Sequence, residues 1–273
     1  MHVVAIIPAY QEAATIRDVA MRTLACCASV VVVDDGSTDG TGACLDGLPV
    51  ELVTHATNEG KAASLCDGFA AAIARGADLV VTLDGDGQHR PEDIPRLVAA
   101  AEQHPGRLIV AARLRNRDAA PRARRIANGI ADFWMSWAAG HPVLDSQSGQ
   151  RAYPGALLRA LLARPVRHDR HASFSFESEV VIVAAAYGFR TVAVPIDTLY
   201  HRGARASHFR PVRDIARIVR MVAGHLIADH LALPGLWRSL ADAPEVAEPP
   251  ARAPGREYNR DAAGRPRGAT HRP

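Results

Sequence analysis

Short apolar runs rich in β-branched residues alternate with longer alanine-rich stretches along the first half of the chain. Each run has about the length of one buried strand, and the stretches between the runs favour helices. This alternation is typical of a layered α/β domain with a largely parallel sheet. We expect strands at residues 2–7, 30–33, 50–54, 78–83 and 107–112, and helices at residues 13–28, 41–45, 61–75 and 91–102.

The second half of the chain is less regular. Residues 211–233 have apolar positions at helical spacing, with arginines mostly elsewhere on the wheel, which predicts a basic amphipathic helix. Such a helix packs on its own domain or lies on an anionic membrane surface. Before it we expect helices at residues 122–139, 155–163 and 176–186, a loop at residues 140–148, and a last strand at residues 191–195.

Composition points to one large folded domain with an appendage. The chain has 273 residues, of which 48% are apolar and 22% charged, as in soluble globular proteins. From residue 241 on, Pro, Ala, Arg and Gly dominate without periodicity, which predicts disorder. We therefore expect a domain at residues 1–210, a helical segment at residues 211–240 and a disordered tail at residues 241–273.

Charge and cysteine content exclude several classes of protein. The net charge of +3 and an aromatic content of only 5%, without aromatic residues interleaved among the arginines, argue against nucleic-acid binding. The four cysteines have neither C-x-x-C nor metal-finger spacing, and no signal peptide precedes the first strand, which favours a reduced cytoplasmic protein. No window of 18 residues is apolar enough to span a bilayer. The sequence does not indicate an oligomeric state.

Acidic residues gather where two of the predicted strands end, and open α/β sheets bind ligands at the carboxyl ends of their strands. One segment, residues 34–41, reads DDGSTDGT and the other, residues 84–89, reads DGDGQH. The first strand is followed by PAYQE and not by G-x-G-x-x-G, which argues against a dinucleotide site. Asp35 suits a role as hydrogen-bond acceptor for a base or ribose.

Asp84 and Asp86 indicate a metal site. Two carboxylates one residue apart, where a buried strand becomes a loop, are costly unless a positive group binds between them. With the amide oxygen of Gln88 they form an oxygen-only ligand set that suits Mg²⁺ or Mn²⁺. The alternative is a polar turn with solvated aspartates.

Six segments together resemble the signatures of family 2 glycosyltransferases, above all the branch that contains dolichyl-phosphate mannose synthase and bacterial polyprenyl-phosphate glycosyltransferases. The likeness covers about residues 3–210. Four of the segments have the order and spacing of the family's motifs: IIPAYQE at residues 6–12, VDDGSTDGT at 33–41, NEGK at 58–61 and LDGDGQHRPED at 83–93. Two more are similar to the branch's D-x-x-S-G-[FL]-R and F-x-x-E segments: DSQSGQR at residues 145–151 and FESE at residues 176–179.

The resemblance implies a GT-A fold, an α/β/α sandwich with a mostly parallel mixed sheet, and an enzyme that takes a sugar from a UDP- or GDP-linked donor with inversion. It places Lys61 near the nucleotide, although a solvated lysine at a helix start is an equal alternative. It also implies that the nucleoside is held by Pro8, Tyr10, Glu12 and Asp35, and the metal on the diphosphate by Asp84, Asp86 and Gln88.

The acceptor decides which further residues the reaction needs. A lipid phosphate needs cations, for which Arg113, Arg125 and Arg202 are the best placed candidates. A hydroxyl acceptor needs a general base, for which the resemblance favours Glu179 over Glu177 and Asp145. A non-catalytic protein that binds nucleotide sugars is the third alternative.

Three departures from the family pattern bear on the acceptor. Gln150 replaces an apolar residue, and residues 202–208 read RGARASH where lipid-phosphate enzymes have a more compact segment. The Q-x-x-R-W motif of processive synthases is absent, which argues for transfer of one sugar per event. We expect an enzyme that acts on a lipid-linked acceptor at the cytoplasmic face and touches the membrane peripherally through the helix at residues 211–233.

Overall fold

The computed structural model describes residues 1–115, 122–163, 175–197, 211–228 and 230–247. Seven strands form one sheet in the order β3-β2-β1-β4-β6-β5-β7, in which β6 is antiparallel to both neighbours and all other pairs are parallel. The strands are β1 Val3–Ala9, β2 Ser29–Asp34, β3 Glu51–Thr54, β4 Leu79–Thr82, β5 Leu108–Ala112, β6 Arg151–Pro154 and β7 Thr191–Pro195.

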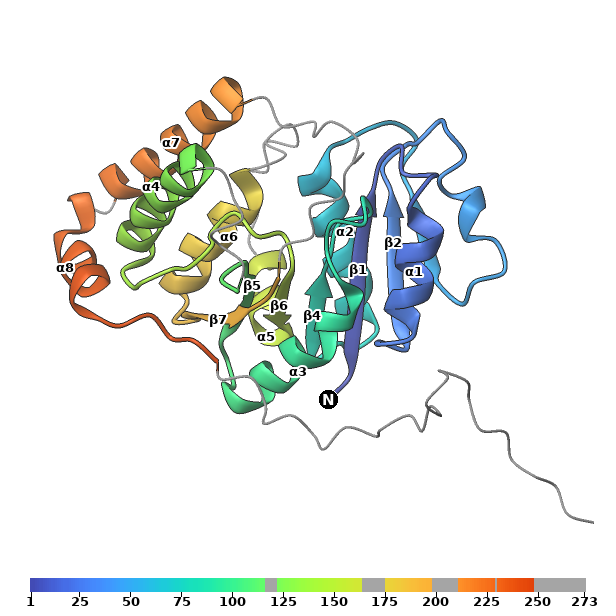
Figure 1. Ribbon diagram of the computed structural model, residues 1–273, viewed down its shortest axis with the longest axis horizontal. Coiled ribbons are helices and arrows are strands. Elements are labelled where there is room, and N and C mark those ends of the chain that lie inside the picture. The colour runs from blue at the N-terminus through green and yellow to red at the C-terminus, as the bar shows by residue number, and fades with distance from the viewer. Residues whose placement is uncertain (116–121, 164–174, 198–210, 229, 248–273) are drawn as a thin grey trace, which may run out of the picture.

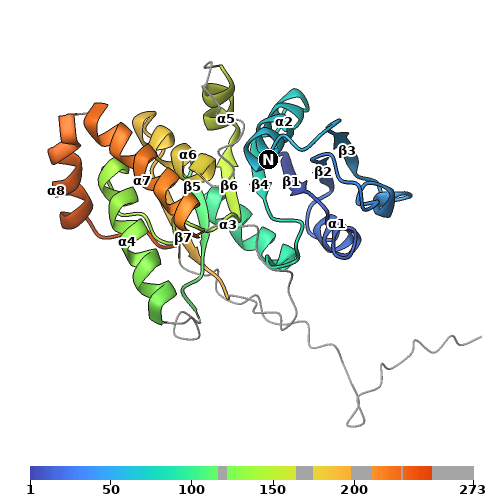
Figure 2. The ribbon, with the colours of Figure 1, turned by 90° about the horizontal axis from the view of Figure 1, so that it is seen from above.

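Helices cover both faces of the sheet (Figure 2). One face is covered by α1 (Ile16–Leu24) and α3 (Ile94–Gln103), and the other by α2 (Lys61–Ala74), α5 (Gly155–Leu162) and α6 (Ser175–Ala186). Alternate residues of β1 enter the two apolar cores, because successive side chains of a strand point to opposite faces. The sheet is therefore buried on both sides, as the apolar strand sequences predicted.

Three further helices form a group beside α6, at the β7 end of the sheet (Figures 1 and 2). They are α4 (Arg122–Ala139), α7 (Pro211–Ala228) and α8 (Leu233–Ala241). The predicted amphipathic helix at residues 211–233 thus ends at residue 228, and a short turn leads into α8. No helix within the described ranges is long and apolar enough to cross a membrane.

The predicted fold class is confirmed, and six of the seven strands lie where the sequence predicted them. The prediction missed β6, whose four residues are too few to show a period and whose first residue is a buried arginine. The helix expected at residues 41–45 is only a 3₁₀ turn, Ala43–Leu45. The helix expected from residue 13 begins at Ile16, because the backbone N–H of Ala13 donates to Asp39 in the loop after β2 at 3.0 Å.

The chain beyond α8 differs from the expected disorder. Glu245 and Ala247 bond to the two backbone groups of Ala193, each at 2.9 Å, so the segment pairs with the outer edge of β7. The guanidinium group of Arg107 adds an ion pair with Glu245 at 2.9 Å. Disorder from residue 241 was therefore a wrong prediction for residues 242–247, and residues 248–273 lie outside the described residues.

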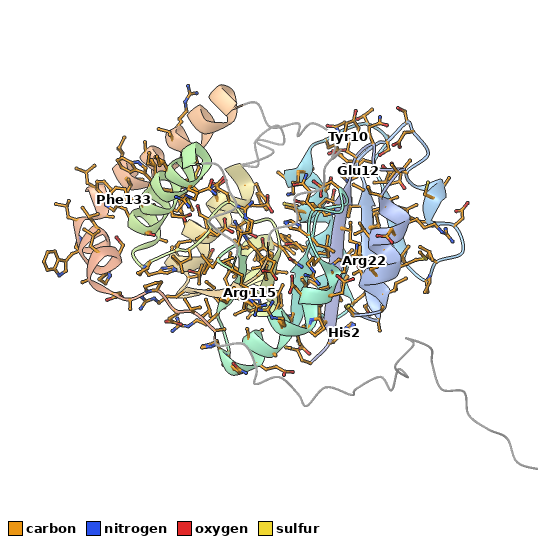
Figure 3. The ribbon with its side chains drawn as sticks, viewed as in Figure 1. His2, Tyr10, Glu12, Arg22, Arg115 and Phe133 are labelled. Carbon is orange, nitrogen blue, oxygen red and sulfur yellow. The ribbon has the colours of Figure 1, made fainter. Side chains whose placement is uncertain are left out.

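The carboxyl ends of the parallel strands lie along one edge of the sheet, and the loops that follow them carry the acidic motifs. Figure 3 shows Tyr10 and Glu12 at this edge, at the opposite end of β1 from His2. The fold thus brings the segments after β1, β2 and β4 side by side.

Candidate active site

The loops after β1 and β2 are held together by side-chain to backbone hydrogen bonds. The backbone N–H of Gln11 donates to the Ser37 hydroxyl at 2.9 Å, and that of Glu12 donates to the Thr41 hydroxyl at 2.8 Å. Gly36 has a φ of +68° and lies against residue 57, so that a Cβ at Gly36 would be 2.5 Å from a backbone carbon of Thr57. Only glycine therefore allows the loop after β2 to pack this closely.

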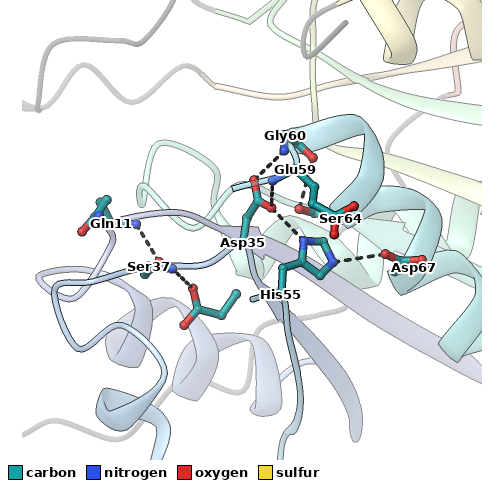
Figure 4. Close-up of polar contacts among 9 residues, drawn as sticks. Gln11, Asp35, Ser37, His55, Glu59, Gly60, Ser64 and Asp67 are labelled. Atoms are coloured by element: carbon teal, nitrogen blue, oxygen red, sulfur yellow. Dashed lines mark hydrogen bonds and ion pairs between the residues drawn. The ribbon is translucent and has the colours of Figure 1, made fainter. Parts of the chain in front are cut away.

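Asp35 organises the entrance to α2 (Figure 4). Its carboxylate accepts hydrogen bonds from the backbone N–H groups of Glu59 and Gly60, each at 2.8 Å, and contacts His55 at 2.7 Å. The other ring nitrogen of His55 lies 3.1 Å from a carboxylate oxygen of Asp67. Asp35, predicted to hold the nucleoside, thus already binds three protein groups and fixes the loop that presents Lys61.

His55 supplies a pH-dependent part of the stability. Burial alone would lower its pKa, but the hydrogen bond and charge of Asp35, with the charge of Asp67, raise the pKa above its ordinary value. The protonated ring therefore stabilises the fold fully below about pH 6.5, the ordinary histidine pKa, and this contribution disappears as the pH rises through the raised value.

We expect His55→Asn to lower the free energy of unfolding by about 2 kcal/mol at about pH 6 and by less at about pH 9. Urea unfolding of both proteins at the two pH values measures the difference. His104→Asn, at the end of α3, is the control and should show no such trend. A loss for His55→Asn that is equal at both pH values would contradict the charged state of this ring.

Lys61, Asp84 and Glu177 form the polar centre of the site. The ammonium nitrogen of Lys61 lies 2.6 Å from Asp84 Oδ1 and 3.1 Å from Glu177 Oε2. Burial alone would raise the pKa of Asp84, but the charges of Lys61 and His89 lower it to about 2. For Lys61 burial alone would lower the pKa, but the charges of Asp84 and Glu177 raise it above its ordinary value. Lys61 is thus no solvated helix-start lysine, and 19% of its side chain is exposed.

Asp86 lies in the same turn, and no cation of the described residues forms an ion pair with it. Burial, followed by the negative charge of Asp84, raises the pKa of Asp86 above its ordinary value. A divalent cation would remove this repulsion, so the two aspartates fit the predicted metal. No group of three or more His, Cys, Asp or Glu side chains in the described part of the chain is arranged to hold a metal. The exposed Gln88, water or phosphate would therefore complete the ligand set.

The two residues just before β6, Gly149 and Gln150, pack against the loop that carries Asp84 and Asp86. A Cβ at Gly149 would lie 3.1 Å from Asp84 Oδ2 and 3.2 Å from Glu177 Oε1, so a side chain here would press on both carboxylates. The amide group of the fully buried Gln150 donates to the carbonyl of Arg90 at 3.0 Å. The departure from the family pattern at Gln150 thus ties the aspartate loop to β6.

Arg151 is fully buried, and its guanidinium group bonds to backbone carbonyls of the described residues. Its guanidinium group donates to Ser146 and Ser148, each at 2.8 Å, and to Glu177. These bonds join the loop before β6 to the first turn of α6. Arg151 therefore positions the Glu177 side chain beside Lys61.

Arg113 forms a two-pronged ion pair with Asp145. The guanidinium nitrogens lie 2.8 and 2.6 Å from the two carboxylate oxygens, and the backbone N–H of Arg113 donates to the same group at 2.7 Å. The positive charge of Arg113 also helps to lower the pKa of Asp84. The positive charge of Arg113 therefore acts on the site. Asp145 is already paired with Arg113, which makes it unsuited to act as a base.

Glu177, and not Glu179, lies beside the Lys61–Asp84 pair in the structure. The two residues are about 200° apart around α6, so they point to different sides of the helix. Glu179 lies 3.8 Å from His225 of α7 and is one-third exposed, whereas Glu177 is buried against Lys61. Glu177 therefore lies at the site, and Glu179, which the resemblance favoured as a base, lies against α7.

The remaining predicted residues differ in how they lie. Pro8 is buried at the end of β1, followed by Tyr10 and Glu12, and the Glu12 carboxylate accepts a hydrogen bond from Thr15 at 3.2 Å. Arg125 is partly buried in the first turns of α4. Arg202 lies outside the described residues.

Sequence reasoning assigned no role to His55, His89 or Arg151. The ring of His89 accepts the backbone N–H of Asp84 at 3.0 Å and so closes the aspartate turn. His89 follows Asp84 by five residues in a glycine-containing loop, so the sequence could have predicted a contact between the two. His55 carried no such signal, because only the pairing of β2 with β3 brings it to Asp35.

Comparisons with known proteins agree with this geometry. Residues 4–157 match the family described as glycosyl transferase family 2. The chain is 30% identical to undecaprenyl-phosphate mannosyltransferase of Micrococcus luteus over 222 residues, covering 72% of this chain and 83% of that protein. It is 29% identical to UDP-N-acetylglucosamine–dolichyl-phosphate N-acetylglucosaminyltransferase of Methanococcus voltae over 216 residues, covering 71% and 84%.

A solved structure shares the fold. Glucosyl-3-phosphoglycerate synthase from Mycobacterium tuberculosis, crystallised with Mn²⁺, UDP and glucosyl-3-phosphoglycerate, superposes with a TM-score of 0.53 at 21% identity. The match covers 83% of this chain and 78% of that chain. It supports the GT-A architecture.

Proposed function

The chain belongs to glycosyl transferase family 2, and we propose that it moves one sugar from a nucleotide-sugar donor to a polyprenyl-phosphate acceptor. The observation that carries the proposal is the cluster of Asp84, Asp86, Lys61 and Glu177 at the carboxyl edge of the sheet. The two relatives named for transfer to undecaprenyl and dolichyl phosphate support the acceptor class.

The donor diphosphate would lie over the turn after β4. Asp84 and Asp86, with Gln88, would hold Mg²⁺ or Mn²⁺ there, which when bound neutralises charge on the departing diphosphate. The Mn²⁺ and UDP bound to the M. tuberculosis enzyme support this choice of ion. The nucleoside would lie toward the loops after β1 and β2, which Gln11, Ser37 and Asp35 hold in place.

Lys61 would supply the protein's own positive charge at this point. Its ammonium group is shared between Asp84 and Glu177, so it can turn toward a phosphate oxygen without leaving the carboxylates. A preorganised charge of this kind stabilises the diphosphate as negative charge develops on it. Glu177 and Arg151 would keep Lys61 in that orientation.

A lipid phosphate needs no general base, because it is already an anion at neutral pH. One of its oxygens would bond to the anomeric carbon while the bond from that carbon to the nucleoside diphosphate breaks, which inverts the configuration. Arg113 lies near Asp84 and would attract the acceptor phosphate. Arg125 and Arg202 remain candidates for the same role.

Transfer of label from UDP- and GDP-linked sugars to undecaprenyl phosphate in detergent, with and without EDTA, tests the proposal. We expect a lipid-linked product that carries one sugar and disappears when the divalent cation is removed. Donor hydrolysis without a lipid product, for every donor and in the presence of Mn²⁺, would contradict it.

The main alternative is a hydroxyl acceptor with Glu177 in place of Glu179 as base. One observation favours it, because Glu177 Oε1 is buried, faces Gly149 and has no hydrogen-bond partner within the described part of the chain. Glu177→Gln separates the two functions. We expect it to lower kcat by about tenfold, because Lys61 loses one carboxylate, whereas loss of a base costs about 100-fold or more. Single-turnover transfer measures this, and Glu179→Gln, which faces α7, is the matched control.

A further inference from the structure

Most exposed large apolar side chains of the described residues lie on the helical group α4, α7 and α8. This set includes Trp134 and Trp237, and the third tryptophan of the chain, Trp137, is partly buried on α4. Trp237 is 75% exposed, an unusual position for the largest apolar side chain. We call this surface the aromatic face, and its principal exposed residues are Ile130, Phe133, Trp134, Leu233, Trp237 and Leu240.

The aromatic side chains of α4 pack on one another and reach the turn before α8. On α4, Phe133 packs edge-on against Trp134, and Trp134 stacks on Trp137 with ring centroids 5.2 Å apart. The indole N–H of Trp137 donates to the carbonyl of Leu231 at 2.9 Å, in the turn that leads to α8. Figure 3 shows Phe133 at the end of the molecule away from β1 and β2.

Close backbone contact fixes α8 against α4. A Cβ at Gly235 would lie 3.2 Å from the Trp137 carbonyl oxygen and 3.3 Å from Gly140 Cα, so glycine allows the two helices to approach. Leu233, Trp237 and Leu240 follow one another at helical spacing on the exposed side. Because α8 packs closely on α4, the exposed apolar side chains of α8 belong to a helix that is fixed on the domain.

The same helices carry strong positive charge. Their sequences contain seven arginines against two aspartates, although the whole chain has a net charge of only +3. One aspartate, Asp132, is used inside the fold, where it accepts the backbone N–H groups of Asp145 and Ser146. Arg220 and Arg238 are exposed among the described side chains.

We propose that the aromatic face docks on an anionic lipid surface, with its tryptophans at the level of the headgroups. This inference rests on the proposed function, because a polyprenyl-phosphate acceptor lies in a bilayer. Tryptophan favours the membrane interface, where its ring is partly apolar and its N–H is solvated, and arginine binds lipid phosphates. From the sequence we expected the membrane contact at residues 211–233. The exposed apolar side chains of the aromatic face lie on α4 and α8 instead.

Charge argues against two other occupants. A second copy would bring two arginine-rich faces together, which like charges oppose. Residues 248–273 contain six arginines, and Tyr258 is their only large apolar residue, so that segment offers no apolar partner. An anionic lipid surface complements both the charge and the apolar side chains.

Tryptophan fluorescence reports on this face, because Trp134 and Trp237 are exposed on it and the third tryptophan, Trp137, stacks on Trp134. We expect the full chain to sediment with vesicles of phosphatidylethanolamine and phosphatidylglycerol, with emission shifted to shorter wavelength. Binding to phosphatidylcholine vesicles should be about tenfold weaker, because the arginines lose their anionic partners. An unchanged spectrum and no sedimentation with the anionic vesicles would overturn the proposal.

Leu233→Gln and Trp237→Gln should each weaken binding to the anionic vesicles by about tenfold. Met21→Gln, an exposed apolar residue on α1 at the other end of the sheet, is the matched control and should bind as the unaltered chain does. Thermal unfolding checks that the variants fold. Vesicle binding that survives both substitutions would overturn the proposal, as would a lipid-free dimer that Trp237→Gln converts to a monomer.

Transfer to a short-chain, water-soluble isoprenyl phosphate separates this inference from the proposed function. The two variants should retain it, because the aromatic face is not part of the reaction centre. Loss of vesicle binding with transfer retained supports lipid docking. If the unaltered chain binds vesicles but transfers no sugar to any isoprenyl phosphate, the proposed function fails, and this inference loses the premise on which it rests.

Discussion

Asp86→Asn should lower kcat/KM for sugar transfer by about 100- to 1000-fold, the cost of removing one preorganised electrostatic group from such a site. The pKa of Asp86 is raised by burial and by Asp84, so its carboxylate is held where a cation must bind to offset the repulsion. An asparagine keeps an oxygen for the Gln88 backbone N–H, which Asp86 accepts at 2.9 Å, but loses the charge. Initial rates with saturating Mn²⁺ measure the effect.

The fold should survive this substitution, since it leaves the Lys61 to Asp84 contact intact. Asp46→Asn, an exposed aspartate in the loop before β3, is the matched control and should keep full activity. A rate for Asp86→Asn within about threefold of the unaltered enzyme would mean that this carboxylate holds no catalytic cation.

Arg151→Met should destabilise the fold by about 3 kcal/mol or more, because it leaves three carbonyls without their donor. Each unsatisfied buried group costs about 1 to 3 kcal/mol, and methionine fills only part of the volume. Urea unfolding should show a lower midpoint with an unchanged slope. Arg159→Met on the exposed side of α5 should leave the midpoint nearly unchanged.

Activity distinguishes positioning from mere stability at Arg151. Since Arg151 joins the loop before β6 to the first turn of α6, its loss should also displace Glu177 from Lys61. We expect kcat to fall even at temperatures where the variant is fully folded. A variant that is destabilised but has an unchanged kcat would limit Arg151 to a structural role.

The aspartate turn could be predicted because its information is local. Asp84 and Asp86 follow a buried strand within one short segment, and residues that follow a strand lie at its carboxyl end. The position of Lys61 is local information too, because Lys61 ends the NEGK segment and begins α2 directly after Gly60.

Other parts of the site depend on contacts between distant segments. The choice between Glu177 and Glu179 depends on how α6 is rotated against the sheet, and Arg151 holds its first turn through a bond to a residue 26 positions away. The antiparallel β6 could not be read from four residues, yet the segment that leads into it places Gly149 beside Asp84. Asp35 was predicted to bind the nucleoside. Its protein partners, the backbone N–H groups of Glu59 and Gly60, come from the next loop, so the local sequence around Asp35 does not reveal them.

Calorimetric titration of UDP and GDP into the protein, with Mn²⁺ and then with EDTA, tests most directly whether a divalent cation between Asp84 and Asp86 binds the donor. We predict that one of the two nucleotides binds only with the metal, and that Asp86→Asn abolishes the difference. Equal nucleotide affinity in Mn²⁺ and EDTA, unaffected by Asp86→Asn, would contradict the cation's role.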